Sequence, residues 1–264
     1  MNLIADENVL AGVILIALVL VCIMLGIAAI AATVLRIMIF FSYWITNREK
    51  SSGGYTGATA AEKLLSELGY NDIAVRKCGF FAMLFYGNHY NPNKKTVFLR
   101  HSTYVGHNLT AVGLALQKVG LVIQDKRDGD TIKKRWKLQK LALFGPVLFI
   151  PIVIVGLIID ILTLYLTGGT FTGVATLICA LLGVAFFIVC FVLQIMTIKT
   201  ESKANLETLE IMKNYDFLNA YEQEKIAKVF KTYQLAYITD FIISILQIVK
   251  LILKVLLAIV KNKK

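Results

Sequence analysis

The sequence is poor in the residues that hold metals or cross-link small domains. It has 3 prolines, 4 cysteines and 3 histidines in 264 residues. No two cysteines form a Cys-x-x-Cys pair, so neither a disulfide framework nor a zinc knuckle is predicted. The histidines are not spaced as i,i+4 partners and are expected in turns or at the surface: His89, His101 and His107.

Acidic residues are also scarce. Seventeen stand against 28 lysines and arginines, which gives a formal net charge of +11. A positive balance of this size is typical of proteins that bind nucleic acid or anionic lipid, or of membrane proteins that follow the positive-inside rule. With membrane spans present, the positive-inside rule accounts for the charge without a further partner.

Apolar residues are abundant. They make up 57% of the chain, and the mean hydropathy of +0.69 is too high for a soluble globular domain of this length. Residues 9–35 contain no charged side chain and exceed the roughly 20 residues that a helix needs to cross a bilayer. Because residues 1–8 carry Asp6 and Glu7 but no basic residue, a removable secretory signal is not predicted. Residues 1–46 are therefore expected to form an N-terminal transmembrane anchor.

Changes in charge and hydropathy divide the rest of the chain into four segments. Residues 47–140 predict a small cytoplasmic α+β insert, and residues 141–198 predict a transmembrane hairpin. Residues 199–232 predict a cytoplasmic helical segment, and residues 233–264 predict a C-terminal helix with a basic tail. The predicted fold class is a mainly α, multi-span membrane protein.

Within the insert, several local signals are clear. Thr56 is placed to cap a helix that runs to residue 68. Residues 73–78 and 96–100 predict short strands, and residues 108–124 show apolar positions at helical spacing. This last helix is expected to be buried.

The C-terminal segment leaves two arrangements open. Its polar residues form a narrow stripe on an otherwise apolar helix: Asp240, Gln247, Lys250, Lys254 and Lys261. The helix either spans the bilayer with the stripe facing other helices, or lies in the interface with its lysines among the headgroups. A span would place the basic tail outside the cell, so an in-plane or re-entrant arrangement is favoured.

A basic patch precedes the second span. It consists of Lys133, Lys134, Arg135, Lys137 and Lys140. Basic residues beside a span favour anionic headgroups and the cytoplasmic side. Only one aromatic residue is interleaved with them, so a nucleic-acid partner is not predicted. We expect a multi-pass protein of the cell membrane, with the N-terminus outside and the insert in the cytoplasm, whose partners are the lipid bilayer and a membrane protein of unknown identity.

Four short motifs follow the first span in a fixed order. They are Thr56-Gly57-Ala58, His89-Tyr90-Asn91-Pro92, Ala111-Val112-Gly113 and Leu235-Ala236-Tyr237-Ile238. Together they resemble motifs of the YugP-like family of membrane zinc metallopeptidases. The resemblance implies a zincin-like core in the insert, with the motif His-Glu-Val-Gly-His on the helix after Ala-Val-Gly. In such a motif two histidines at i and i+4 bind zinc, and the glutamate acts as general base.

The matching positions in this chain hold Gln117, Lys118 and Leu121. An amide oxygen is a poor zinc ligand, leucine has no lone pair, and the lysine cation would repel the metal. The resemblance also implies an acidic ligand after the third span, where Glu201 stands and Lys203 replaces an aspartate. We therefore expect the family's zinc ion to be absent, no catalytic residue, and a Lys118–Glu201 ion pair in place of the metal.

Three functions stay open at this point. The first is an inactive metallopeptidase homologue, a pseudoprotease, that acts as scaffold, adaptor or regulator of membrane proteins. The second is an active membrane zinc peptidase with unusual ligands, such as Glu201 with one of the histidines. The third is a small transporter or channel, suggested by Asp160 and by the polar stripe that begins at Asp240.

Overall fold

The protein is mainly α-helical, with one small sheet. The computed structural model describes residues 2–142, 145–169, 172–215 and 217–262. Within these residues the chain forms nine helices and three short strands, and it divides into two compact units. The fold class predicted from the sequence is confirmed.

The first unit consists of the segments Met1–Ser42 and Lys231–Lys264. It contains most of α1 (Asn2–Thr46) and the second part of α9 (Ala220–Asn262). Both helices are long and apolar enough to cross a membrane. The helix α9 runs without a break through the boundary predicted at residue 233, and its part from Lys231 onward belongs to this unit.

The polar stripe of α9 includes an ion pair inside this unit. Asp240 Oδ1 lies 3.5 Å from Arg36 Nη2 of α1. A charged side chain on an apolar helix is costly unless it has an opposite charge or water nearby. The pairing with Arg36 therefore gives Asp240 a structural role between two apolar helices.

The second unit, Tyr43–Phe230, holds the insert and a helical hairpin. Its first helix, α2 (Gly57–Glu67), begins where the sequence predicts, because Thr56 caps it. Thr59 N donates to Thr56 Oγ1 at 3.0 Å, and Thr56 N donates to Thr59 Oγ1 at 2.8 Å. This reciprocal capping box satisfies two backbone donors at the helix start.

A three-stranded sheet follows in the order β1-β3-β2. β1 (Ala74–Lys77) pairs in parallel with β3 (Thr96–Leu99), and β2 (His89–Asn91) pairs with β3 in the antiparallel direction. β1 and β3 are the strands expected from the sequence. β2 was not predicted, because all three of its residues are buried and show no apolar–polar alternation.

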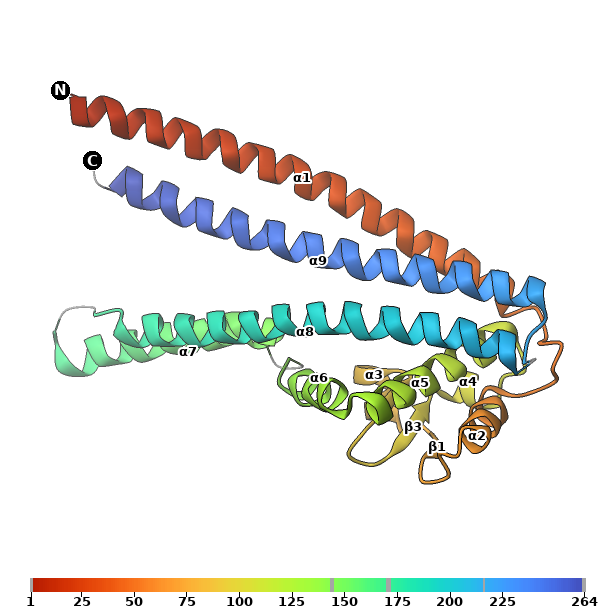
Figure 1. The fold of residues 1–264 in the computed structure, drawn as a ribbon. Helices are drawn as coiled ribbons and strands as arrows, with labels where there is room; N and C mark the ends of the chain where they lie inside the picture. Colours follow the sequence, from red (N-terminus) through yellow and green to blue (C-terminus); the bar gives the residue numbers. More distant parts are fainter. Residues whose placement is uncertain (1, 143–144, 170–171, 216, 263–264) are drawn as a thin grey trace. The chain divides into compact units, whose positions relative to one another are not determined.

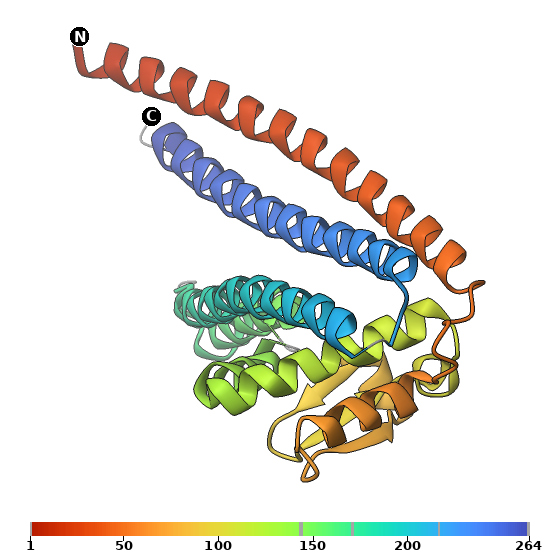
Figure 2. The same cartoon turned by 45° about the vertical axis from the view of Figure 1, so that its right-hand side comes forward.

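The central helix of the insert is α5 (Leu109–Arg127). It begins after Asn108, whose Oδ1 accepts a hydrogen bond from Ala111 N at 2.8 Å. Residues 115–124 are all buried, as the sequence predicts. The reason is that α5 lies between α8 on one side and the sheet with α2 on the other (Figures 1 and 2).

Three shorter helices complete the insert: α3 (Phe80–Tyr86), α4 (His101–Val105) and α6 (Gly129–Ala142). α3 buries none of its residues. α6 packs against α5 and α8 and carries the chain to the hairpin (Figure 1).

The hairpin consists of α7 (Gly145–Thr167) and α8 (Val174–Asn214). α8 is long and apolar enough to cross a membrane, and α7 is a shorter apolar helix over Pro151–Thr167. Residues 174–198 of α8 carry no charge and, at about 1.5 Å per residue, can cross a hydrocarbon layer of roughly 30 Å. The charged remainder of α8 runs along the insert (Figure 1).

The sequence predicts one helical segment over residues 199–232, but in the structure two helices share this part of the chain. α8 ends at Asn214 and α9 begins at Ala220, and Phe217, which lies between them in the sequence, is fully buried. Glu222, in the first turn of α9, accepts hydrogen bonds from Asn219 N at 2.8 Å and Ser52 N at 2.7 Å. The buried phenyl ring and these hydrogen bonds hold the turn against the insert.

Asp160 is buried where α7 meets the start of α8. Its carboxylate accepts hydrogen bonds from Ala175 N at 3.1 Å, and from Thr176 N at 2.8 Å and Thr176 Oγ1 at 2.7 Å. The first N–H groups of a helix have no partner within that helix, so the carboxylate acts as a cap supplied by the neighbouring helix. The acidic residue that suggested a transporter therefore has a structural role.

Replacing this cap tests its importance. Asp160→Leu should destabilise the hairpin by about 1–3 kcal/mol, because the N–H groups at the start of α8 lose their acceptor in apolar surroundings. The unfolding midpoint in detergent micelles, followed by tryptophan fluorescence, measures the loss. In the control variant Thr163→Val, the lost hydroxyl donates only to Ile159 O one turn earlier, and the midpoint should hardly change. Equal losses in the two variants would contradict the capping role.

Candidate functional site: a buried charge network between α5 and α8

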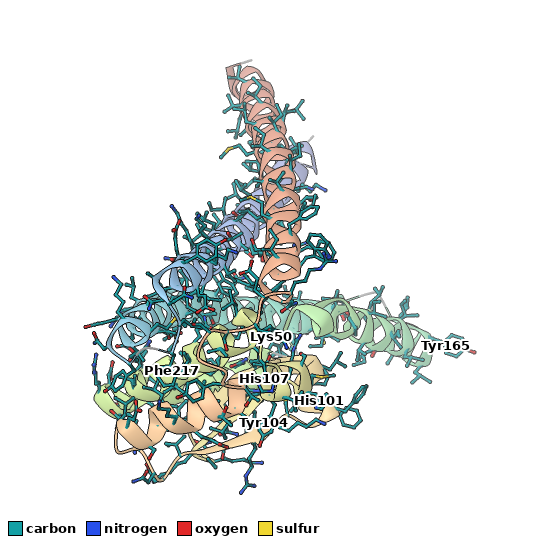
Figure 3. The ribbon with its side chains drawn as sticks, turned by 90° about the vertical axis from the view of Figure 1, so that its right-hand side faces the viewer. Lys50, His101, Tyr104, His107, Tyr165 and Phe217 are labelled. Atoms are coloured by element: carbon teal, nitrogen blue, oxygen red, sulfur yellow. The ribbon has the colours of Figure 1, made fainter. Side chains whose placement is uncertain are left out.

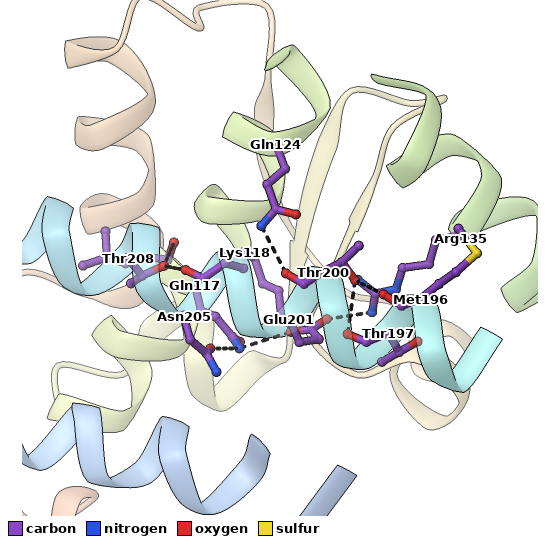
Figure 4. Close-up of polar contacts among 12 residues, drawn as sticks. Gln117, Lys118, Gln124, Arg135, Met196, Thr197, Thr200, Glu201, Asn205 and Thr208 are labelled. Atoms are coloured by element: carbon purple, nitrogen blue, oxygen red, sulfur yellow. Dashed lines mark hydrogen bonds and ion pairs between the residues drawn. The ribbon is translucent and has the colours of Figure 1, made fainter. Parts of the chain in front are cut away.

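α5 and α8 bring together side chains from the positions at which the resemblance implies a metal site. Lys118 Nζ lies 3.1 Å from Glu201 Oε2, which is the contact expected from the sequence (Figure 4). The side chains are 10% and 5% exposed, so the pair is shielded from water. Leu121 is also buried, but it belongs to the hydrophobic core.

Gln117, on the same helix as Lys118, also contacts the carboxylate of Glu201. Its Nε2 donates to Glu201 Oε2 at 3.1 Å and to Asn205 Oδ1 at 2.6 Å. Asn205 follows Glu201 by one turn of α8, so the two acceptors lie on one helix face. Gln117 therefore presents its NH2 group to the site rather than its carbonyl oxygen.

Arg135 of α6 supplies a second cation. Its Nη2 lies 2.7 Å from Glu201 Oε1, and its side chain is only 13% exposed. This corrects the sequence-based placement of Arg135 in a membrane-surface patch. Lys133, Lys134 and Lys137 are exposed as expected, whereas the side chain of Lys140 lies outside the described residues.

Helical spacing could have identified the inward position of Arg135. It shares one face of α6 with Ile132 and Trp136, at i, i+3 and i+4, and both neighbours are buried. The lysines at 133, 134 and 137 lie on the other face. Asn205 and the donor role of Gln117 left no such signal, because both depend on how α5 packs against α8.

Both oxygens of the Glu201 carboxylate accept hydrogen bonds. Oε1 accepts from Arg135, and Oε2 accepts from both Lys118 and Gln117. Two cations and one anion leave this network with a charge of +1. The two cations stabilise the ionised carboxylate despite its burial.

These groups do not fit a zinc ion. Zinc binds imidazole nitrogen, thiolate sulfur or carboxylate oxygen, which all offer a lone pair. Around Glu201 the neighbouring groups are an ammonium, a guanidinium and an amide NH2. Within the described part of the chain, no three His, Cys, Asp or Glu side chains come together as a metal site would need.

The histidines occupy two kinds of position. His101 and His107 are exposed on the insert, close to Tyr104 (Figure 3). His89 is buried on β2, contrary to the expectation of a turn or surface residue. Its ring stacks on Phe98 and on Trp136, with ring centroids 5.1 and 5.6 Å away. The stacking partners come from β3 and α6, which the sequence alone could not place beside it.

The environment of His89 predicts a pH effect on stability. Burial lowers the pKa of His89, a contact with Gly87 O partly raises it, and the charge of Lys118 lowers it further. The folded state therefore holds a neutral imidazole, while the unfolded chain takes up a proton near pH 6.5. The resulting stabilisation is present above about pH 6.5 and is lost as the pH falls through the lower pKa of the folded state.

The variant His89→Phe removes this proton-binding group and keeps an aromatic ring. Its unfolding midpoint should fall less than that of the wild type when the pH is lowered from about 7.5 to 5.5. The exposed His101 is the matched control, and His101→Phe should keep the wild-type pH dependence. If His89→Phe loses as much stability over this range as the wild type, the buried neutral imidazole is not the cause.

The comparisons with known proteins point to one family. Residues 13–256 match the family described as "Putative neutral zinc metallopeptidase". The chain is similar to "Putative membrane protease YugP" of Bacillus subtilis (strain 168), with 23% identity over 211 residues. This alignment covers 78% of the chain and 84% of that protein. No solved structure matches the chain.

Proposed function

Because the chain belongs to the neutral zinc metallopeptidase family, we propose that it is a member in which a buried charge network replaces the zinc ion. In this proposal the protein does not hydrolyse peptide bonds. It acts as a scaffold, adaptor or regulator of membrane proteins. The observation that carries the proposal is the Glu201 carboxylate, whose two oxygens accept hydrogen bonds from Lys118 and Arg135.

The charge network supports the loss of zinc chemistry. A divalent cation placed beside Glu201 would meet the positive charges of Lys118 and Arg135 at close range. Lys118 also stands where the family motif has its general base, and an ammonium cannot accept a proton. The same two cations stabilise the contact between α5, α6 and α8, which is the structural task that a shared metal ion would perform.

The position of the network supports a partner in the membrane. Lys199 is the first charged residue of α8, and Glu201 follows it by two residues. The network therefore lies where the apolar part of α8 ends and the insert begins. A peptidase-like framework at this level is suited to contact membrane proteins where their spans leave the bilayer.

The exposed charges support an orientation in the cell membrane. Lys133, Lys134 and Lys137 are exposed on the helix that leads into the hairpin. The far end of the hairpin, near Tyr165, carries no charge between Asp160 and Lys199 (Figure 3). Under the positive-inside rule the insert faces the cytoplasm and the N-terminus lies outside.

Metal analysis of the purified full chain tests this proposal. The wild type should contain no more zinc than Glu201→Ala, and neither should cleave an unfolded test protein when zinc is added. Glu224→Ala is the control, because Glu224 is exposed and pairs with Lys228 on the surface of α9. Near-stoichiometric zinc in the wild type and in Glu224→Ala, lost in Glu201→Ala, would show an active enzyme with unusual ligands.

A further inference from the structure

α3 exposes a run of large apolar side chains on the second unit. Phe80, Phe81, Leu84 and Phe85 are 70%, 75%, 67% and 57% exposed, and we call these four residues the α3 patch. Phe80 and Phe81 contact each other edge to face, with ring centroids 5.6 Å apart. Exposed apolar area costs roughly 25 cal/mol per Å², so a contiguous patch of this kind marks a surface that is covered in the working protein.

A chain of contacts places the α3 patch at the level of the membrane boundary. Tyr86, the last residue of α3, packs its ring 5.2 Å from that of Trp136 on α6. The preceding residue, Arg135, binds Glu201 of α8 at 2.7 Å. Glu201 follows the uncharged residues 174–198 by three positions, or about 4–5 Å along the helix. α3 therefore lies beside the point where α8 leaves the hydrocarbon layer.

Basic side chains accompany the apolar ones. Arg76 and Lys77 at the end of β1 are exposed shortly before α3, and Lys133, Lys134 and Lys137 are exposed on the adjoining α6. Aromatic and aliphatic side chains next to lysines and arginines are typical of segments that lie in a membrane interface. There the apolar groups enter the acyl boundary and the cations meet anionic headgroups.

We propose that the α3 patch inserts into the headgroup and acyl boundary of the leaflet that faces the insert. It gives the insert a membrane contact in addition to the spans. Because α3 is linked to Arg135 through Trp136, this contact fixes the height of the Glu201 network above the bilayer. The proposal does not depend on whether the network is catalytic.

Site-directed photo-crosslinking tests this in the full chain. Benzoylphenylalanine replaces Phe81 in protein reconstituted into vesicles of phosphatidylcholine and phosphatidylglycerol, and adducts are identified by mass spectrometry after illumination. The expected result is a lipid adduct at position 81, several-fold more abundant than at position 206. Leu206 is the matched control, because it is 67% exposed on α8 but lies eight residues, about 12 Å, beyond the uncharged part of that helix.

The outcomes separate the lipid from other occupants of the α3 patch. Adducts to a second copy, or to α1 or α9 of the same chain, would overturn the proposal in favour of a protein contact. A lipid adduct of equal yield at position 206 would also overturn the proposal. So would the absence of a lipid adduct at position 81 when benzoylphenylalanine in place of Ile154 of α7 gives one. Benzoylphenylalanine at Leu84 provides a second measurement if the variant at Phe81 does not fold.

Discussion

Glu201→Gln should destabilise the second unit by about 3–5 kcal/mol, because it leaves two cations facing each other in a buried site. Lys118 and Arg135 are 10% and 13% exposed, so water cannot replace the lost carboxylate charge. The substitution keeps the shape of the side chain and removes its negative charge. It also replaces one acceptor oxygen with an NH2 group, so donors around position 201 lose an acceptor as well. Unfolding of the full chain in mixed micelles, titrated with sodium dodecyl sulfate and followed by tryptophan fluorescence, measures the change in free energy.

Two further variants distinguish a network from a simple pair. Lys118→Met alone should cost less than Glu201→Gln, because Glu201 still accepts hydrogen bonds from Arg135 and Gln117. The combined variant Lys118→Met/Arg135→Met/Glu201→Leu should recover most of the stability, because apolar groups of similar size often replace a buried ion triad without loss.

A control variant on α9 tests whether the loss of stability depends on the burial of the ion pair or only on the loss of a charge. Glu224 pairs with Lys228 at 2.8 Å, but their side chains are 66% and 72% exposed. Glu224→Gln should therefore change the free energy of unfolding far less than Glu201→Gln does, because solvent screens an exposed pair. A loss as small as this in Glu201→Gln would mean that the Glu201 network does not stabilise the contact between α5 and α8.

Local patterns in the sequence are sufficient to predict part of this site. The apolar spacing of residues 108–124 predicts the buried helix α5. The motif resemblance then placed Lys118 and Glu201 together, although they are 83 positions apart in the chain. A pair so distant in sequence has no local signal of its own, since it depends on packing between two helices.

The parts that the sequence did not reveal depend on tertiary packing. Arg135 is a partial exception: charge composition groups it with the surface lysines, whereas helical spacing puts it on the face of Ile132 and Trp136, and only packing shows that Glu201 is its partner. His89 was expected at the surface, yet Trp136 from α6 covers its ring. The α3 helix was missed because its seven residues are almost all apolar and show no helical period.

Gly120→Leu should destabilise the second unit by about 3 kcal/mol, because there is no room for a side chain between α5 and α8. A Cβ at Gly120 would lie 2.9 Å from Ala204 O and 2.9 Å from Thr208 Oγ1. Both atoms belong to α8, so a larger side chain has to push the two helices apart. At Gly79 a Cβ would meet no atom within 4 Å, and Gly79→Leu is the control that should cost far less.

The same separation should weaken the Glu201 network. Gly120 lies two residues from Lys118 on α5, and Ala204 lies three residues from Glu201 on α8, so both contacts need the same distance between the helices. In Gly120→Leu the ion pairs are already stretched, and adding Glu201→Gln should cost less than it does in the wild type. The expected interaction energy is about 1 kcal/mol or more, within the range of neighbouring sites. If the two losses simply add, the close approach at Gly120 does not position Glu201 against Lys118, and each contact stabilises the helices separately.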